Sequence, residues 1–170
     1  IEHTKTLSKL VQTGPRNFQV SYNIVVVNKG GKADNYALAD RPAFDNDISI
    51  LGARYNTDAP SHPANPGSIN LAGTGPWNLS SGQNINPGAV HTYTIQVDVS
   101  INLEDGKGDN RYDQCGRAQS SYPVSNEGLF NESQLDISSD GTVDQKDTAC
   151  ADVPYIVHEK FTQNVIDRGN

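Results

Sequence analysis

The chain has no methionine, few cysteines and no apolar stretch long enough to cross a membrane. It also lacks a recognisable signal peptide and any segment with a convincing helical period of apolar residues. The absence of a spanning segment argues against membrane insertion. Because the chain begins at Ile1 and not at a methionine, we expect it to be a fragment or a processed product.

Basic residues are scarce and do not cluster. The chain of 170 residues carries 13 lysines and arginines against 20 aspartates and glutamates, for a net charge of −7. Nucleic acid is excluded as a partner, since nothing basic gathers to neutralise phosphates. The scattered acidic residues suit a soluble, extracellular surface. The length suits one domain, and a hydrophobic content of 35% suffices for a thin core.

The two cysteines are Cys115 and Cys150. An even, well-separated pair predicts a disulfide formed in an oxidising compartment. Closing a loop of about 35 residues would stabilise the fold by about 3–4 kcal/mol in the chain-entropy model. The alternative is a pair of free, buried thiols.

Several segments show strict alternation of apolar residues, which predicts strands with one buried face. The clearest are Phe18–Val26 and Tyr93–Leu103. Further strands are expected at 1–8, 34–40, 47–55, 128–137 and 150–158, with short ones near 69–71 and 77–79. The polar stretches 57–88 and 104–126 predict long loops. Many strands joined by polar loops predict an all-β, immunoglobulin-like antiparallel sandwich.

One short pattern occurs twice. Ile1, His3 and Lys5 recur as Ile156, His158 and Lys160, after the linker-like Val153-Pro154. This echo predicts a sandwich repeat over 1–155, followed at 156–170 by a linker or the first strand of the next repeat. A period of this length is typical of beads on a string and not of a solenoid.

Three polar residues share the apolar face of three different predicted strands. Lys5 has the parity of Ile1 and Leu7, Asp40 that of Leu38, and Asn131 that of Leu129 and Leu135. Burying one such group alone is costly, so we expect the three side chains to meet. The alternative is that each lies at a strand end, with Lys5 reaching solvent and Asp40 pairing with Arg41 or capping a turn.

A meeting of these groups in a low-dielectric core would favour the neutral amine and the neutral acid. Protonated Asp40 could then polarise the Asn131 carbonyl, Lys5 Nζ could attack it, and ammonia could leave. The product would be an isopeptide cross-link between the first and penultimate strands. This would be a single event during folding and not enzymatic turnover, so the chain is not expected to be an enzyme.

The same residues lie in motifs that resemble a repeat of large bacterial surface proteins, related to pilin and collagen-adhesin modules. The motifs occur in the family's order over nearly the whole chain: Thr4–Leu7, Val20–Gly30, Leu38–Pro42, Gly128–Ser133 and Asp147–Pro154. The resemblance implies an immunoglobulin-like sandwich in tandem stalks on the cell surface. It also implies a Lys5–Asn131 isopeptide bond beside Asp40. Ser133 departs from the pattern, because a small apolar residue is usual there.

Calcium is a further candidate, although no cofactor is required. Asp105, Asp109 and Asp113 lie in a predicted loop with oxygen ligands suited to a hard cation, and so do Asp140 and neighbouring aspartates. Neither segment has the spacing of an EF-hand. The alternative is a pair of ordinary solvated turns.

These patterns predict a monomeric stalk or spacer module of a bacterial surface adhesin, with neighbouring repeats of the same chain as partners. A different possibility is a binding module whose long loops 57–88 and 104–126 grip a host protein or glycan. A third is an accessory domain of an enzyme. Copies of this pattern beside it in the parent gene would favour the stalk.

Overall fold

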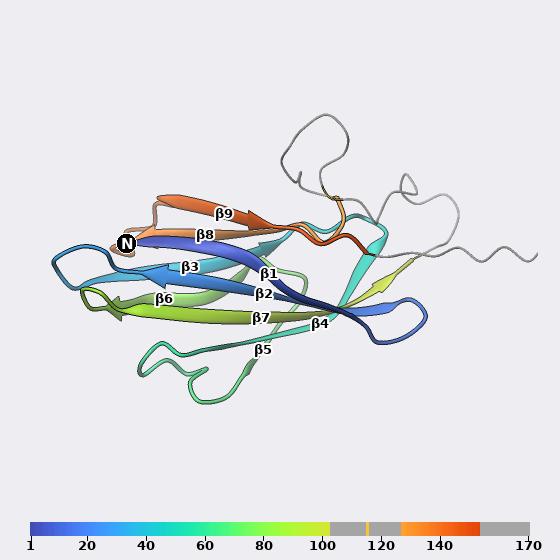
Figure 1. The fold of residues 1–170 in the computed structure, drawn as a ribbon, viewed down its shortest axis with the longest axis horizontal. Helices are drawn as coiled ribbons and strands as arrows, with labels where there is room; N and C mark the ends of the chain where they lie inside the picture. Colours follow the sequence, from blue (N-terminus) through green and yellow to red (C-terminus); the bar gives the residue numbers. More distant parts are fainter. Residues whose placement is uncertain (103–114, 116–126, 154–170) are drawn as a thin grey trace, which may run out of the picture.

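Antiparallel strands in two packed sheets make up the computed structural model, which describes residues 1–102, 115 and 127–153 (Figure 1). The segment 156–170, expected to lead into a next repeat, lies outside the described residues. The strands within the described part are β1 (Glu2–Gln12), β2 (Asn17–Val27), β3 (Asp34–Pro42), β4 (Ile48–Thr57), β5 (Ile69–Leu71), β6 (Trp77–Ile85), β7 (Val90–Ile101), β8 (Asn131–Ile137) and β9 (Gln145–Ala149).

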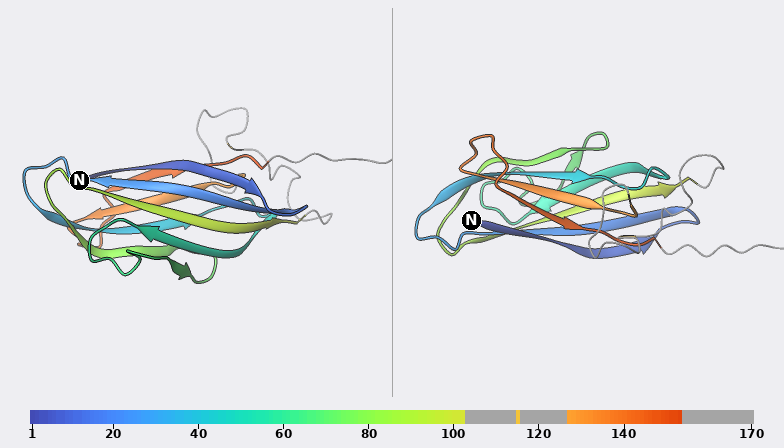
Figure 2. Two further views of the ribbon diagram at one scale, coloured as in Figure 1. Left: turned by 60° about the horizontal axis from the view of Figure 1, so that its bottom comes forward. Right: turned by 90° about the horizontal axis from the view of Figure 1, so that it is seen from above.

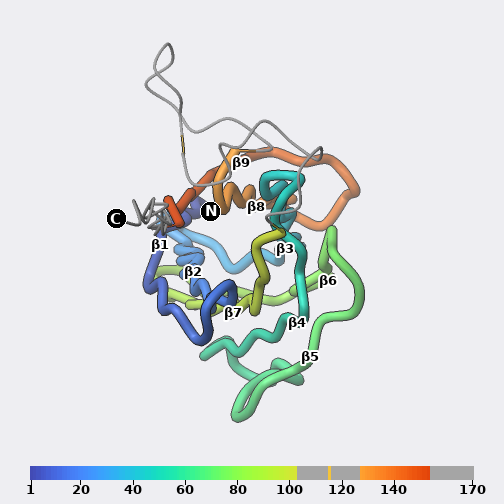
Figure 3. Tube along the Cα trace, turned by 90° about the vertical axis from the view of Figure 1, so that its right-hand side faces the viewer, coloured from blue at the N-terminus to red at the C-terminus, as the bar shows by residue number. Residues whose placement is uncertain are grey.

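The strands form one sheet in the order β1-β2-β7-β4-β5 and a second in the order β6-β3-β8-β9. Every pairing between neighbours is antiparallel. Figure 3 shows the two layers end-on, with β1 at the edge of the first sheet beside β9 at the edge of the second. The prediction of an all-β antiparallel sandwich is therefore confirmed.

Alternating side chains of β2 and β7 build the centre of the core, as the sequence pattern predicts. Alternate residues of both strands are buried, among them Val20, Ile24, Val97 and Val99, all with no exposed surface. The core is also rich in tyrosine. The Tyr36 hydroxyl lies 2.9 Å from the Tyr93 hydroxyl and 2.9 Å from His91 Nδ1, so its polar end is satisfied inside the sandwich.

Trp77 begins β6 and acts as a core anchor. It is 4% exposed, and its indole nitrogen donates to the Ala72 carbonyl at 3.0 Å. From Trp77 the strand continues to Ile85, well beyond the short strand expected near 77–79. Its longer ladder with β3 compensates for the weak apolar pattern of the sequence, because main-chain hydrogen bonds do not depend on side-chain type.

The strand expected at 150–158 is wrong over its described part. The chain leaves β9 at Ala149, and residues 150–153 are not part of a strand. Ala151 and Val153 are nevertheless buried, at 3% and 1% exposure, and the Ala151 carbonyl accepts from the Leu129 amide at 3.0 Å. The alternating burial of Ala151 and Val153 therefore resembles that of a strand, although residues 150–153 cover the end of the core and form no strand pairing.

Leu7 also departs from its predicted burial. It shares the parity of Lys5, yet it is 41% exposed. A β-bulge follows it, since the register with β2 shifts between Leu7 and Lys9. Beyond the bulge Leu10, which has the opposite parity, packs against the core, so the parity set by Lys5 no longer predicts the buried face.

Candidate functional site

Lys5 extends from β1 into the sandwich. The residue is 4% exposed and its side chain is fully enclosed. His3, two positions earlier, is also inward and 7% exposed, because alternate residues of a strand share a face. The alternative that Lys5 reaches solvent is therefore wrong.

Asp40 and Asn131 lie on neighbouring strands of the second sheet. In the β3–β8 register Asp40 is opposite Ser133, and Pro42 is opposite Asn131. The period of two residues puts both polar side chains on the inner face. Asp40 and Asn131 each have no exposed surface.

The Asp40 carboxylate bridges the other two side chains. Lys5 Nζ donates a short hydrogen bond to Asp40 Oδ1, and Asn131 Nδ2 donates to Asp40 Oδ2 at 2.9 Å. Asn131 Oδ1 is buried and accepts no hydrogen bond from any described residue. The structure thus brings together, from three strands and both sheets, the lysine, aspartate and asparagine that strand parity predicts to meet.

The surroundings of the Lys5 ammonium oppose its charge. Burial lowers the pKa of Lys5 below its ordinary value of 10.5, while the charge and hydrogen bond of Asp40 act in the opposite direction. The Tyr22 ring lies 5.1 Å from Nζ and shields it from water. A lysine held this way is closer to being a neutral amine nucleophile than one on the surface.

Arg41 does not compete for Asp40. Its side chain points to the other face of β3 and donates to Gln134 Oε1 at 3.2 Å. The alternative in which Asp40 pairs with Arg41 is therefore wrong. Adjacent residues of a strand face opposite sides, so the two charges are kept apart by the backbone.

The trio contains each group that amide transfer requires. Lys5 supplies the nucleophile, Asn131 the electrophilic carbon, and Asp40 a carboxylate that can take a proton from one nitrogen and give it to another. Moving the Lys5 proton to Asp40 turns the ion pair into a neutral pair. Rotation of the Asn131 amide would then place its carbonyl oxygen, now without a partner, against the acidic proton of Asp40.

A second polar cluster flanks the trio on β1, β8 and β9. His3 Nε2 lies 3.0 Å from Ser133 Oγ, and Ser133 Oγ donates to the Asp147 carbonyl at 3.3 Å. Asp147 Oδ2 accepts the Lys5 amide at 2.6 Å, and Gln145 Oε1 accepts the His3 amide at 3.2 Å. Sequence reasoning missed this cluster. The signals for it were the inward parity of His3 and the polar residue at Ser133.

Cys115 and Cys150 form a disulfide next to the start of β8, with their Cα atoms 6.0 Å apart. The bridge packs on Gly128, where an added Cβ would lie 2.9 Å from Cys115 Sγ and 2.9 Å from the Ala151 carbonyl oxygen. The alternative of two free thiols is wrong. The bridge therefore ties the segment that follows β9 to the loop that enters β8.

The candidate calcium ligands Asp105, Asp109 and Asp113 lie outside the described residues. In the second candidate segment, Asp140 Oδ1 accepts the Thr142 amide at 2.8 Å, and Asp144 Oδ2 accepts the Ile137 amide at 2.7 Å. These carboxylates cap the β8–β9 turn. Within the part of the chain that the structure describes, no group of three or more histidine, cysteine or acidic side chains is arranged to hold a metal ion.

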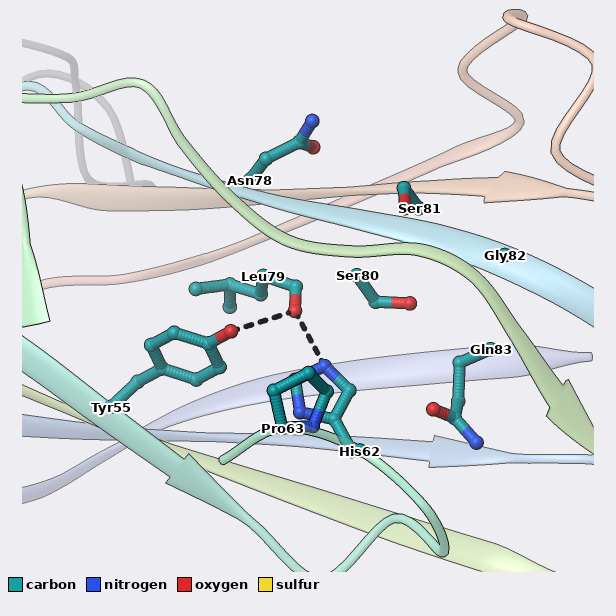
Figure 4. Close-up of a pocket in the computed structure, with 9 residues that line it drawn as sticks. All are labelled: Tyr55, His62, Pro63, Asn78, Leu79, Ser80, Ser81, Gly82 and Gln83. Atoms are coloured by element: carbon teal, nitrogen blue, oxygen red, sulfur yellow. Dashed lines mark hydrogen bonds between the residues drawn. The ribbon is translucent and has the colours of Figure 1, made fainter. Parts of the chain in front are cut away.

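A separate pocket of about 330 Å³ lies between β6 and the loop after β4 (Figure 4). His62 Nε2 lies 2.8 Å from the Leu79 carbonyl oxygen, which also accepts from the Tyr55 hydroxyl at 3.1 Å. Serine, asparagine and glutamine side chains of β6 line its mouth. It is built from the loop region that the sequence indicates as a binding surface.

Comparisons with models of protein families, with curated proteins and with solved structures found no match for this chain. The likeness to the adhesin repeat therefore rests on the sequence motifs, and the site has to be interpreted from its own geometry. Among the residues described, no helix is long and apolar enough to cross a membrane.

Proposed function

We propose that this chain is a structural module whose two sheets become covalently tied by an amide bond between Lys5 Nζ and Asn131 Cγ. The observation that carries the proposal is the fully buried Asp40 carboxylate, hydrogen-bonded to both side chains at once. Burying a lysine, an aspartate and an asparagine as separate, unpaired groups would cost a large free energy, because each must be desolvated. A neutral cross-link would remove the charges.

The reaction balances with the groups present. Asp40 takes one proton from the Lys5 ammonium, and the neutral amine attacks Asn131 Cγ to give a tetrahedral intermediate. Asp40 then transfers a proton from Nζ to Nδ2, the Cγ–Nδ2 bond breaks, and one ammonia leaves. The net change exchanges the Cγ–Nδ2 bond for a Cγ–Nζ bond and releases one ammonia, while the proton first taken from the ammonium remains on Asp40, and no oxidant or cofactor is consumed.

The position of the bond suits a load-bearing role. It would join β1 at the edge of one sheet to β8 inside the other, so neither sheet could separate from the other at that side. Together with the disulfide, it fits a stalk or spacer module of a bacterial surface adhesin, joined to neighbouring repeats and exposed outside the cell. The motif likeness to adhesin and pilin repeats supports this setting.

Intact mass after reduction tests the cross-link. The wild-type chain should weigh one ammonia less than its sequence, while Asn131→Ala and Lys5→Arg should keep their full mass. Arginine retains a cation for Asp40 but cannot lose its proton to become a nucleophile. Lys9→Arg, on the exposed part of β1, is the matched control and should lose ammonia as the wild type does. A wild-type chain of full mass would disprove the proposal.

A binding module is the second candidate, and the pocket beside β6 is the observation in its favour. Its volume of about 330 Å³ lies at the lower end of the range of small-molecule sites. Screening of the folded chain on glycan and matrix-protein arrays tests it. Binding that Gln83→Ala abolishes would favour this candidate, and an array without binding favours the spacer.

A further inference from the structure

The edge of β1 that faces away from β2 is held by side chains of β9. Gln145 Oε1 accepts the His3 amide at 3.2 Å, and Asp147 Oδ2 accepts the Lys5 amide at 2.6 Å. Both bonds join residues 142 positions apart, so the two strands run parallel and in step. Gln145 Nε2 also donates to the Ile1 carbonyl at 2.9 Å. Figures 1 and 2 show both strands along the same side of the sandwich.

These contacts replace the main-chain ladder that would otherwise continue the sheet. The carboxylate and amide of β9 take the place of backbone carbonyls and bind the outward-facing amides of β1. The Asp147 main chain takes part as well, because its carbonyl accepts from Ser133 Oγ, which in turn contacts His3. Asp147 on β9, in the second sheet, therefore holds the main chain of Lys5, whose Nζ is the nucleophile.

Without this link, β1 would be placed by its pairing with β2 in the first sheet. Asp40 and Asn131 belong to the second sheet, so any sliding between the layers would move Lys5 relative to both. Bond formation requires reacting atoms about 3–3.5 Å apart, and a misplacement of about 1 Å can cost about a hundredfold in rate. The short, charge-assisted hydrogen bond from the Lys5 amide to the Asp147 carboxylate limits this displacement, because it fixes the main chain from which the Lys5 side chain extends.

We propose that Asp147 is a positioning residue for cross-link formation, holding the main chain of Lys5 so that its side chain meets Asp40 and Asn131. This inference rests on the proposed function. Asp147 touches none of the reacting atoms. Its charge favours the Lys5 ammonium and so does not help to make the neutral amine. Any gain from Asp147 therefore comes through the Lys5 backbone and affects the rate of the reaction once the sandwich has formed.

Refolding of the full chain tests the inference. Chain that is kept unfolded in denaturant retains the Lys5 amine and the Asn131 amide as separate groups. Dilution of the denaturant starts folding. Samples taken at intervals are quenched in acid, and their intact mass shows the loss of ammonia. Trp77 fluorescence follows folding in parallel, so the cross-linking rate is taken after the folding phase. Asp147→Ala should slow cross-linking about tenfold or more, because it removes the acceptor. Asp147→Asn keeps an acceptor oxygen and should restore the rate to within about threefold of the wild type.

Asp144→Ala is the matched control. It removes the same kind of bond, a carboxylate oxygen accepting a main-chain amide at 2.7 Å, but in the β8–β9 turn away from Lys5. Its rate should stay within about twofold of the wild type. Should Asp147→Ala not fold, Gln145→Ala takes its place and should also slow the reaction, because it frees the β1 main chain one pair of residues away.

The outcomes separate the two proposals. A wild-type chain that never loses ammonia overturns both. A wild-type chain that cross-links while Asp147→Ala keeps the same rate overturns the positioning role alone. The positioning role is also overturned if Asp147→Asn cross-links as slowly as Asp147→Ala, or if Asp144→Ala cross-links equally slowly. In these cases a general loss of stability would account for the slower reaction.

Discussion

At the scale of single residues, Asp40 accounts for the tolerance of charge inside the core. Its two oxygens are divided between Lys5 and Asn131, and all three side chains are buried. The ion pair and the neutral amine–acid pair hold the same number of protons. The reactive form can therefore arise by proton transfer within the pair, without exchange with solvent.

Replacing Asp40 tests this arrangement. Asp40→Ala should prevent the loss of ammonia. Its free energy of unfolding should be about 3–5 kcal/mol below that of Asn131→Ala, which keeps the Lys5–Asp40 pair but cannot cross-link, because the Lys5 ammonium is left buried without a partner. Urea denaturation and intact mass measure the two effects. Asp98→Ala, which removes a carboxylate from the outer side of β7, is the control and should cost about 1 kcal/mol or less. An Asp40→Ala chain that still cross-links would contradict the shuttle role.

His3 predicts a pH dependence of stability. Burial lowers the pKa of His3 below its ordinary value of 6.5, so the unfolded chain binds the proton more tightly than the folded one. The charges near its ring are Asp147 on β9 and Lys5 on its own strand, and Ser133 and Gln145 are its neutral partners. The free energy of unfolding should therefore fall as the pH drops below about 6.5 toward the lowered pKa of His3 in the folded state.

His3→Gln separates this effect from general acid unfolding. Glutamine keeps hydrogen-bonding capacity but does not titrate, so the variant should lose less stability over the same interval. Burial also lowers the pKa of His91, so part of the slope should remain in the variant. Denaturation curves at a series of pH values measure it. Equal slopes in wild type and variant would count against a buried, neutral His3.

At the scale of the strand, the trio could be predicted from sequence, whereas its support could not. Lys5, Asp40 and Asn131 break a period-two apolar pattern, and such a break in a half-buried strand predicts a polar group in the core that needs a partner there. Asp147 and Gln145 lie in QKDTA, which has no such pattern. Their partners are main-chain amides of a strand at the other end of the chain, and no local preference encodes that contact.

The turn that delivers β8 offers a test at this scale. Gly128 has φ of +51°, and a Cβ there would meet Cys115 Sγ and the Ala151 carbonyl at 2.9 Å. Gly128→Ala should lower the free energy of unfolding by about 1–3 kcal/mol and slow cross-linking, because Asn131 follows three residues later. Gly52→Ala is the control, since nothing lies within 4 Å of its added Cβ. Thermal unfolding curves measure the stability. A Gly128→Ala chain that unfolds at the same temperature as the wild type would show that the Cys115–Cys150 disulfide can shift to make room for the added Cβ.

At the scale of the whole molecule, the two covalent links would decide how the domain carries load. A force applied to the two ends of the chain would pass from Ile1 to Lys5, across the new amide to Asn131, and on toward Cys150. Strands β2 to β7 lie between the linked positions and would be bypassed. A disulfide alone leaves them in the path of the force, because Cys115 lies after all of them.

Single-molecule extension under oxidising conditions distinguishes these cases. In the cross-linked chain the disulfide lets the force pass from Asn131 back to Cys115 and across to Cys150. This stretch is shorter than the direct one from Asn131 to Cys150, so it limits the release between the links to about 60 Å at about 3.5 Å per residue. Lys5→Arg, which keeps the disulfide but cannot form the amide, should release the chain up to Cys115, about 400 Å. Lys9→Arg should behave as the wild type. Residues 154–170 contribute equally to every variant, so the difference between variants isolates the cross-link. If wild type and Lys5→Arg extended by the same length, no covalent tie would shield the sandwich from force.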